Sequence, residues 1–257
     1  MDAATRQKWL TDTRRFWDAD SKFQAMYRRI CSSPEFDATR DQERLQLMWD
    51  DETARAVQMV TKGVPLNDDW TCLEIGCGIG RLLRPMARRC REVIGCDISS
   101  KMVQWAQEYL ADTPNAEVRL NEGCSLSGID DTSIDFVYSH LAFQHITAQS
   151  VVDAYLCEIR RVLKPGGYCR IQNCREAPKP IVESLKDLVR PLLGKQEYRS
   201  PRHWSWSQGR KVEFGGITFY PRRWRKRLRA HGLKPIATDL GLGHDFWMWT
   251  TCIRPPR

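Results

Sequence analysis

Three glycines at every second position, and an aspartate that follows them, are the residues of this chain best suited to hold a nucleotide. Gly76, Gly78 and Gly80 follow one apolar run, and Asp97 ends the next. Glycine adopts backbone angles that other residues resist, and its missing side chain lets a ligand approach the chain and the N-terminus of a following helix. A carboxylate placed like that of Asp97 can accept both hydroxyls of an adenosine ribose. The pattern predicts a nucleotide-cofactor loop with its ribose partner.

Two histidines could accept a proton in such a site. His140 and His145 come directly after the apolar run 134–139. A histidine titrates near neutral pH and suits general-base work. A capping or core role remains an alternative for His145, and His203 and His244 are further candidates.

A polar and aromatic stretch at 198–206 could contact a substrate. Flat aromatic rings beside guanidinium groups suit a sugar ring, a nucleobase or an aromatic acid that bears a phosphate or carboxylate. The alternative is a loop that two tryptophans pack on the core. The candidate substrate-binding residues of this stretch are Arg199, Arg202, His203, Trp204 and Trp206.

Short apolar runs alternate with helix-compatible segments through the middle of the chain. This alternation predicts an α/β fold with a doubly wound, mostly parallel sheet of seven strands. In such a sheet ligands lie outside the carboxyl ends of the strands, where the glycine loop and Asp97 both fall. The expected strands are 71–75, 92–96, 116–120, 134–139 and 167–173, and the expected helices between them are 80–89, 99–111 and 148–163.

The flanking segments divide the chain into four expected parts. Apolar residues at helical spacing predict an N-terminal helical cap over 1–64, before the core at 65–175. An insertion at 176–216 interrupts the alternating pattern and is expected to form a lid over the substrate. Residues 217–257 return to the core with one helix and two strands at 234–240 and 246–253, an antiparallel C-terminal hairpin.

The glycine loop and three later segments together resemble the class I S-adenosylmethionine (SAM) dependent methyltransferases. Glu74 to Gly80 resembles motif I of that family, and Asp97 matches its acidic second-strand end. Residues 134–139 resemble its fourth strand, and 158–167 resemble the helix and turn that follow. The resemblance implies a Rossmann-like methyltransferase fold, SAM as the cofactor and methyl transfer as the activity.

The resemblance also implies roles for individual residues. Asp97 would bind the ribose, Ile98 and Met102 would enclose the adenine, and Glu74 would hold the methionine ammonium through a water, orient the loop or be only structural. Where relatives place an aspartate that binds the adenine amino group, this chain has Cys124 or Ser125, which leaves that contact to a weaker group. His140 would lie where the chain passes the methyl group. The full set expected at the cofactor is Glu74, Gly76, Cys77, Gly78, Gly80, Asp97, Ile98, Met102, Cys124, Ser125 and Ser139.

Composition limits the remaining choices. The net charge is +8, and residues 176–257 hold 17 lysines and arginines against 7 acidic residues. This excess indicates either an anionic partner or substrate or a solvated basic face. Ten scattered cysteines without a Cys-x-x-Cys pair, and no long apolar run, indicate a reduced cytoplasmic protein without a structural metal, a membrane span or a signal peptide.

Three functions are consistent with these observations. The first is a methyltransferase acting on an oxygen or nitrogen nucleophile of a small molecule, anionic or uncharged, under the cap and lid. The second is an RNA or nucleotide methyltransferase that uses the basic C-terminal third, although no RNA-binding module is recognisable beside the core. The third is a non-catalytic SAM-binding partner subunit.

Overall fold

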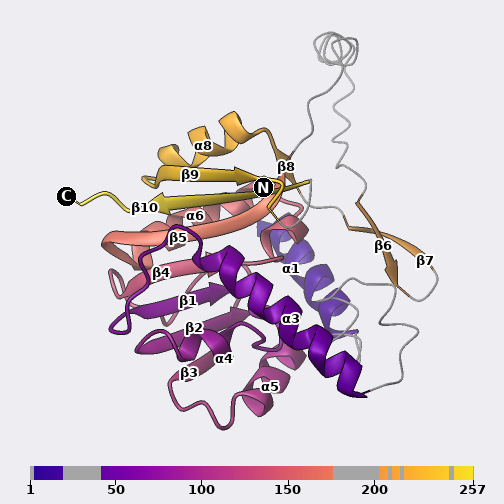
Figure 1. Ribbon diagram of the computed structural model, residues 1–257. Helices are drawn as coiled ribbons and strands as arrows, with labels where there is room; N and C mark the ends of the chain where they lie inside the picture. The colour runs from indigo at the N-terminus through magenta and orange to yellow at the C-terminus, as the bar shows by residue number, and fades with distance from the viewer. Residues whose placement is uncertain are drawn as a thin grey trace, which may run out of the picture.

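A mixed eight-stranded sheet forms the centre of the computed structural model, which describes residues 3–19, 42–175, 203–207, 210–214, 217–242 and 246–256 (Figure 1). The strand order is β3-β2-β1-β4-β5-β10-β9, and the short strand β8 pairs with β5 off this path. The predicted doubly wound sheet is confirmed, and β8 is an addition that the sequence did not indicate. The strands are β1 Thr71–Ile75, β2 Glu92–Asp97, β3 Ala116–Leu120, β4 Ile134–Ser139, β5 Leu163–Arg175, β8 Thr218–Phe219, β9 Lys234–Leu240 and β10 Trp247–Ile253.

The sheet is parallel from β3 to β5 and closes with an antiparallel pair. β10 runs antiparallel to both β5 and β9, so the last strand of the chain lies inside the sheet and β9 lies at its edge. β5 is longer than the predicted 167–173, and it reaches from Leu163 to Arg175. The added residues pair Leu163 with Ile134 of β4, and Cys174 with both Trp247 of β10 and Thr218 of β8.

Helices cover both faces of the sheet, and each face has its own apolar core. α6 and α8 pack on one face through residues such as Leu156, Ile159 and Trp224, whereas α3, α4 and α5 pack on the other. Burial on both faces explains why the central strands are continuous apolar runs rather than alternating ones. The helices are α1 Ala3–Asp18, α3 Gln42–Thr61, α4 Leu83–Ala87, α5 Ser100–Tyr109, α6 Gln149–Val162 and α8 Pro221–Ala230, with a 3₁₀ turn, η2, at Phe143–His145.

Two segments have a structure that the sequence did not predict. α4 covers only five residues of the predicted helix 80–89, because Gly80, Arg81 and Leu82 still belong to the turn that precedes it. Within the predicted insertion, β6 His203–Ser207 and β7 Arg210–Phe214 form an antiparallel two-stranded sheet of their own.

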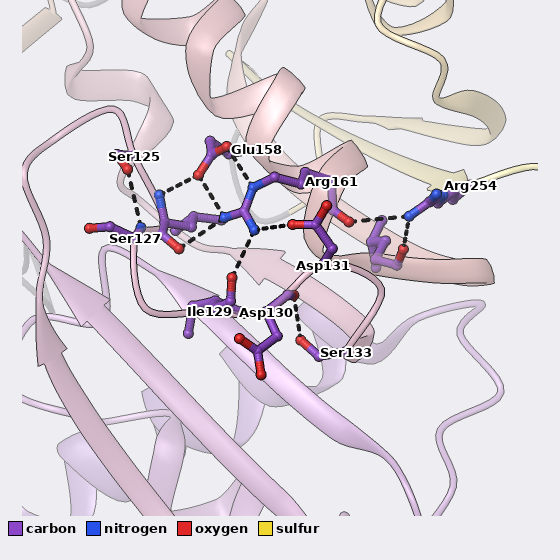
Figure 2. Close-up of polar contacts among 11 residues, drawn as sticks. Ser125, Ser127, Ile129, Asp130, Asp131, Ser133, Glu158, Arg161 and Arg254 are labelled. Carbon is purple, nitrogen blue, oxygen red and sulfur yellow. Dashed lines mark hydrogen bonds and ion pairs between the residues drawn. The ribbon is translucent and has the colours of Figure 1, made fainter.

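Arg161 on α6 fixes the long connection between β3 and β4 (Figure 2). Its guanidinium donates to both carboxylate oxygens of Glu158 at 2.9 Å, to Asp131 at 2.7 Å and to two backbone carbonyls of the connection. Glu158 in turn accepts the backbone N–H of Leu126 at 2.7 Å. Arg254 donates to the carbonyls of Arg161 and Leu163, which joins the C-terminal segment to the same cluster (Figure 2). The segment 158–167, singled out for its resemblance, therefore has a structural role in this chain.

Candidate active site

An open cleft lies at the carboxyl ends of β1, β2 and β4. The fold places it where open α/β sheets bind ligands, beside the loops that follow the parallel strands. The predicted site residues that line it are Glu74, Gly76, Cys77, Gly78, Asp97, Ile98, Met102, His140 and His145.

The glycine loop after β1 has the backbone geometry that only glycine adopts readily. Gly76, Gly78 and Gly80 have φ angles of +76°, +54° and +80°. A Cβ on Gly76 would lie 2.3 Å from the Cβ of Ala142, so this glycine allows the loop after β4 to pass close by. A Cβ on Gly78 would meet nothing within 4 Å, so the loop leaves open space there. The loop thus both touches the histidine segment and leaves its own backbone accessible.

Asp97 is buried and held by backbone N–H groups. One carboxylate oxygen accepts the N–H of Gly78 at 2.8 Å and the other accepts the N–H of Ser99 at 2.9 Å. Burial raises the pKa of Asp97, and these backbone donors oppose that shift. Each oxygen retains a further lone pair, so the carboxylate can accept two more hydrogen bonds from a ligand.

Glu74 is a buried carboxyl on β1 beside Asp97. Burial raises its pKa to about 8, and the nearby positive charge of Arg81 only partly opposes this. Its Oε2 atom is buried without a hydrogen-bond partner among the described residues. A buried carboxyl in this state favours a cationic or hydrogen-bond-donating ligand, because such a partner would supply the missing contact.

His140 is buried directly after β4. Burial lowers its pKa to about 3, helped by the positive charge of Arg81, so the ring is neutral at physiological pH. The ring stacks on Trp249 of β10 with centroids 5.4 Å apart, and Trp247 contacts it edge-on at 6.0 Å. The near-neutral titration expected from the sequence is therefore wrong for His140, because a buried imidazole resists taking a charge.

His145 ends the η2 turn on the other side of the cleft. Its Nε2 lies 3.2 Å from the side-chain nitrogen of Gln144, and its ring contacts Trp17 of α1 edge-on at 5.2 Å. The structure therefore brings both predicted histidines to the cleft, each in a different environment.

Four residues expected at the cofactor lie behind the cleft wall. Ser139 donates to the carbonyl of Ile75 at 2.8 Å, and Ser125 accepts the backbone N–H of Ser127 at 3.1 Å. Gly80 faces Leu110 and Ala106, and Cys124 belongs to the buried core. Any contact from these four to a ligand would need their backbone or a rearrangement.

The predicted substrate stretch lies mostly outside the described residues. Arg199, Arg202 and His244 fall outside the described residues. His203, Trp204 and Trp206 lie on β6, paired with β7, and only their backbone is described.

The sequence missed a wall of the cleft that α1 supplies. Trp9, Thr13 and Trp17 line it, and Figure 1 shows α1 on the side to which β1 and β2 point. The spacing of four residues was the available signal, since it places all three on one helix face. Arg81, Phe143 and Tyr155 are further lining residues that the sequence did not single out.

Polar contacts hold α1 against the cleft. Ser99 donates to the Asp18 carboxylate at 2.6 Å, and Lys101 donates to the Asp18 carbonyl at 2.5 Å. Near the middle of the helix, Arg14 donates to the carbonyl of Asn121 at 3.2 Å. These contacts join α1 to the segments after β2 and β3.

No group of three or more His, Cys, Asp or Glu side chains among the described residues is arranged to hold a metal ion. None of the described helices is long and apolar enough to cross a membrane.

Comparison with known proteins identifies the class of this fold. It is similar to geranyl diphosphate C-methyltransferase from Streptomyces coelicolor (TM-score 0.62, 12% identity, 96% of this chain and 97% of that chain). It is also similar to phosphoethanolamine N-methyltransferase 1 from Haemonchus contortus (TM-score 0.66, 14% identity, 100% of this chain and 50% of that chain). The chain has the class I SAM-dependent methyltransferase fold.

The sequence comparisons also find methyltransferases, and they show how much of the chain matches. Residues 73–171 match the methyltransferase domain family, and the chain carries this domain. The chain is 31% identical over 126 residues to a demethylmenaquinone methyltransferase of Tropheryma whipplei (strain Twist), covering 48% of this chain and 51% of that protein. A demethylmenaquinone methyltransferase of Staphylococcus aureus (strain MRSA252) is 26% identical over 167 residues, which cover 61% of this chain and 66% of that protein. The match to the T. whipplei protein thus spans about half of that relative's length.

Proposed function

We propose that the chain binds SAM and transfers its methyl group to an oxygen or nitrogen nucleophile of a small molecule. The observation that carries this proposal is the pairing of Asp97 with the glycine loop at an open cleft. The carboxylate is buried, already oriented by the N–H of Gly78, and still able to accept two hydrogen bonds. This is the arrangement that a ribose with two adjacent hydroxyls requires.

The residues present fit the cofactor at three points. Asp97 would accept the ribose hydroxyls, and Ile98 and Met102 would contact the adenine from the cleft wall. Glu74, whose Oε2 lacks a hydrogen-bond partner, would receive the methionine ammonium, and the positive charge would restore its ionised form. The bound cofactor would supply an electrophilic methyl group on a sulfonium.

The chain's own contribution to the reaction is positioning and the exclusion of water. The aromatic rings of Trp9 and Trp17 cover the cleft from α1, and the loop after β4 forms the facing wall. Holding two reactants in line replaces a bimolecular encounter with a unimolecular one. His140 is neutral near pH 7, so its imidazole can accept a hydrogen bond from a hydroxyl or amine nucleophile without first losing a proton.

A small substrate fits the covering of the cleft by α1 better than a polymer does. We assign 1–64 to a helical cap, 65–175 to the SAM-binding core, 176–216 to a substrate lid and 217–257 to the closing elements. The basic residues of 176–257 would favour an anionic substrate. Buried cysteines of the core such as Cys72, Cys169 and Cys252 are free thiols, which supports a reducing compartment such as the cytoplasm.

The experiment is calorimetric titration of the full chain with SAM and S-adenosylhomocysteine. Asp97→Ala should weaken both by about 10- to 150-fold, the equivalent of about 1.5 to 3 kcal/mol for hydrogen bonds to a charged group. Asp112→Ala is the matched control, because this exposed carboxylate pairs with Arg84 away from the cleft. Unchanged affinity in a folded Asp97→Ala variant would remove Asp97 from the site and contradict the proposal.

Measuring methyl transfer distinguishes the small-molecule methyltransferase from an RNA methyltransferase and from a non-catalytic partner subunit. A chain that binds SAM but transfers no methyl group to any small-molecule or RNA pool would be a partner subunit. Methylation confined to RNA would instead support the second function. RNA binding that is weak and falls steeply with salt would indicate only a nonspecific basic face.

A further inference from the structure

Two glutamine side chains connect the backbone after β4 to the ring of His145. Gln172 on β5 is fully buried, and its Oε1 accepts the backbone N–H of Leu141 at 2.7 Å. Its Nε2 donates to Oε1 of Gln144 at 3.2 Å. Nε2 of Gln144 then lies 3.2 Å from Nε2 of His145. The four groups form a continuous chain of hydrogen bonds along the cleft wall.

The donor and the acceptor of each hydrogen bond in this chain follow from the first bond, which Leu141 donates. A backbone N–H can only donate, so Gln172 must turn its oxygen to Leu141 and its NH₂ group to Gln144. Gln144 must then turn its oxygen to Gln172 and its NH₂ group to His145. The Cys174 thiol, 3.9 Å from the same Gln144 oxygen, can donate to it and is consistent with this orientation.

The tautomer of His145 follows in turn. An amide NH₂ group has no acceptor capacity, so Nε2 of His145 must accept the hydrogen bond and carry no proton. A neutral imidazole has one proton, which is therefore on Nδ1. This assignment depends on the donor at Leu141 and not on any hydrogen position placed in advance.

The backbone at Leu141 holds this chain of hydrogen bonds in one arrangement. Leu141 has a φ of +60°, a left-handed conformation that costs a non-glycine residue free energy and persists only where its surroundings hold it. Gln172 stabilises this conformation through its hydrogen bond from inside the core. Breaking that bond would leave a buried polar group without a partner. The loop conformation and the tautomer are thus fixed by the same side chain.

We propose that His145 is held with its proton on Nδ1, and that Gln144 and Gln172 are positioning residues that maintain this tautomer. This proposal rests on the proposed methyltransferase function. His145 is then not the general base, because Nε2 is occupied and Nδ1 already holds a proton.

The tautomer can be tested by nitrogen NMR of the full chain labelled with ¹⁵N-histidine and saturated with S-adenosylhomocysteine. His145→Gln identifies the signals of this ring. The parent should show a protonated Nδ1 and an unprotonated Nε2. In Gln144→Glu the carboxylate can only accept, so a proton should appear on Nε2. Gln107→Glu, the same change on an exposed position of α5, should leave the tautomer unchanged. A protonated Nε2 in the parent, or a rapidly exchanging mixture, would overturn the assignment.

Failure of S-adenosylhomocysteine to bind would instead refute the proposed function, and the tautomer could still be read in the ligand-free chain.

Discussion

The two halves of the cleft are built in different ways. In the cofactor half, Asp97 is oriented by backbone N–H groups from adjacent strand ends, including that of Gly78. In the histidine half, the loop 140–145 is held by side chains from β5, β10 and α1. A site built from backbone tolerates changes of neighbouring side chains, whereas a site built from side chains depends on each of them. The first half can therefore be shared across a family, and the second half is where specificity can change.

The largest effect is expected where the two halves touch. Gly76→Ala places a Cβ 2.3 Å from that of Ala142 and forces alanine to a φ of +76°. Overpacking costs about 1 to 3 kcal/mol and a left-handed residue about 1 to 2 kcal/mol more. Thermal unfolding should show this loss, and adding Ala142→Gly should recover the overpacking part.

Gly78→Ala is the matched control for that prediction. Its φ of +54° carries the same kind of backbone strain, but its Cβ would meet nothing within 4 Å. This variant should therefore lose only the stability that the strained backbone costs, without the cost of overpacking. Equal losses for Gly76→Ala and Gly78→Ala would mean that the contact with Ala142 does not explain the glycine.

A smaller effect is expected from Glu74, and it should depend on pH. The folded chain keeps a proton on Glu74 up to about pH 8, while the unfolded chain releases it near 4.5. Stability of the ligand-free protein should therefore fall as pH rises from about 4.5 to 8. Glu74→Gln should remove this slope and raise the melting temperature at pH 8 by several degrees, since one pKa unit is worth about 1.4 kcal/mol.

The control for this measurement is Glu122→Gln, an exposed position where the same change should leave the slope intact. A parent protein whose melting temperature is flat between pH 5 and 8 would show that Glu74 is ionised in the fold. SAM should reduce the slope in the parent, because a bound ammonium favours the ionised carboxylate.

His140 should make the stability depend on pH in the opposite direction, and it should do so at acidic pH. The unfolded chain protonates this histidine below about pH 6.5, whereas the folded chain resists until about pH 3. Stability should fall as pH drops through this window. His140→Phe keeps a ring against Trp249 and should be less acid-sensitive, by about 2 kcal/mol at pH 5. Denaturant titrations at pH 5 and 7.5 measure this, and an identical pH dependence for parent and variant would contradict the buried neutral imidazole.

The smallest effect is expected at the end of α1. Asp18→Ala removes the acceptor of the Ser99 hydroxyl and should cost about 1 kcal/mol, the net contribution of one hydrogen bond. Asp12→Ala, at an exposed position of the same helix, should change the melting temperature little. If the two variants lose equal stability, the contact with Ser99 does not secure the helix.

Much of the cofactor half could be predicted from the sequence, because its signals are local. An apolar run, alternating glycines and an acid at the next strand end report one strand-loop-helix unit, and the sheet, Asp97 and the loop were found this way. The chain of hydrogen bonds from Leu141 to His145 could not be predicted, because it depends on the register that pairs Ser139 with Ile171. The tryptophans of α1 could not be placed at the cleft for a similar reason, since helical spacing defines a face but not what that face contacts.

The position of β10 has a consequence for how the chain is made. β9 is synthesised before β10, yet among the described strands its partner in the sheet is β10, which lies between it and β5. While β10 is still in the exit tunnel, β9 has no edge of this sheet to join, and the tryptophan that stacks on His140 has not emerged. The edge of the sheet and the wall behind His140 should therefore form together, once β10 has left the tunnel. Ribosome-bound chains stalled with residues through 246 outside the tunnel should be cleaved readily within 234–240, and chains stalled after 256 has emerged should be protected there.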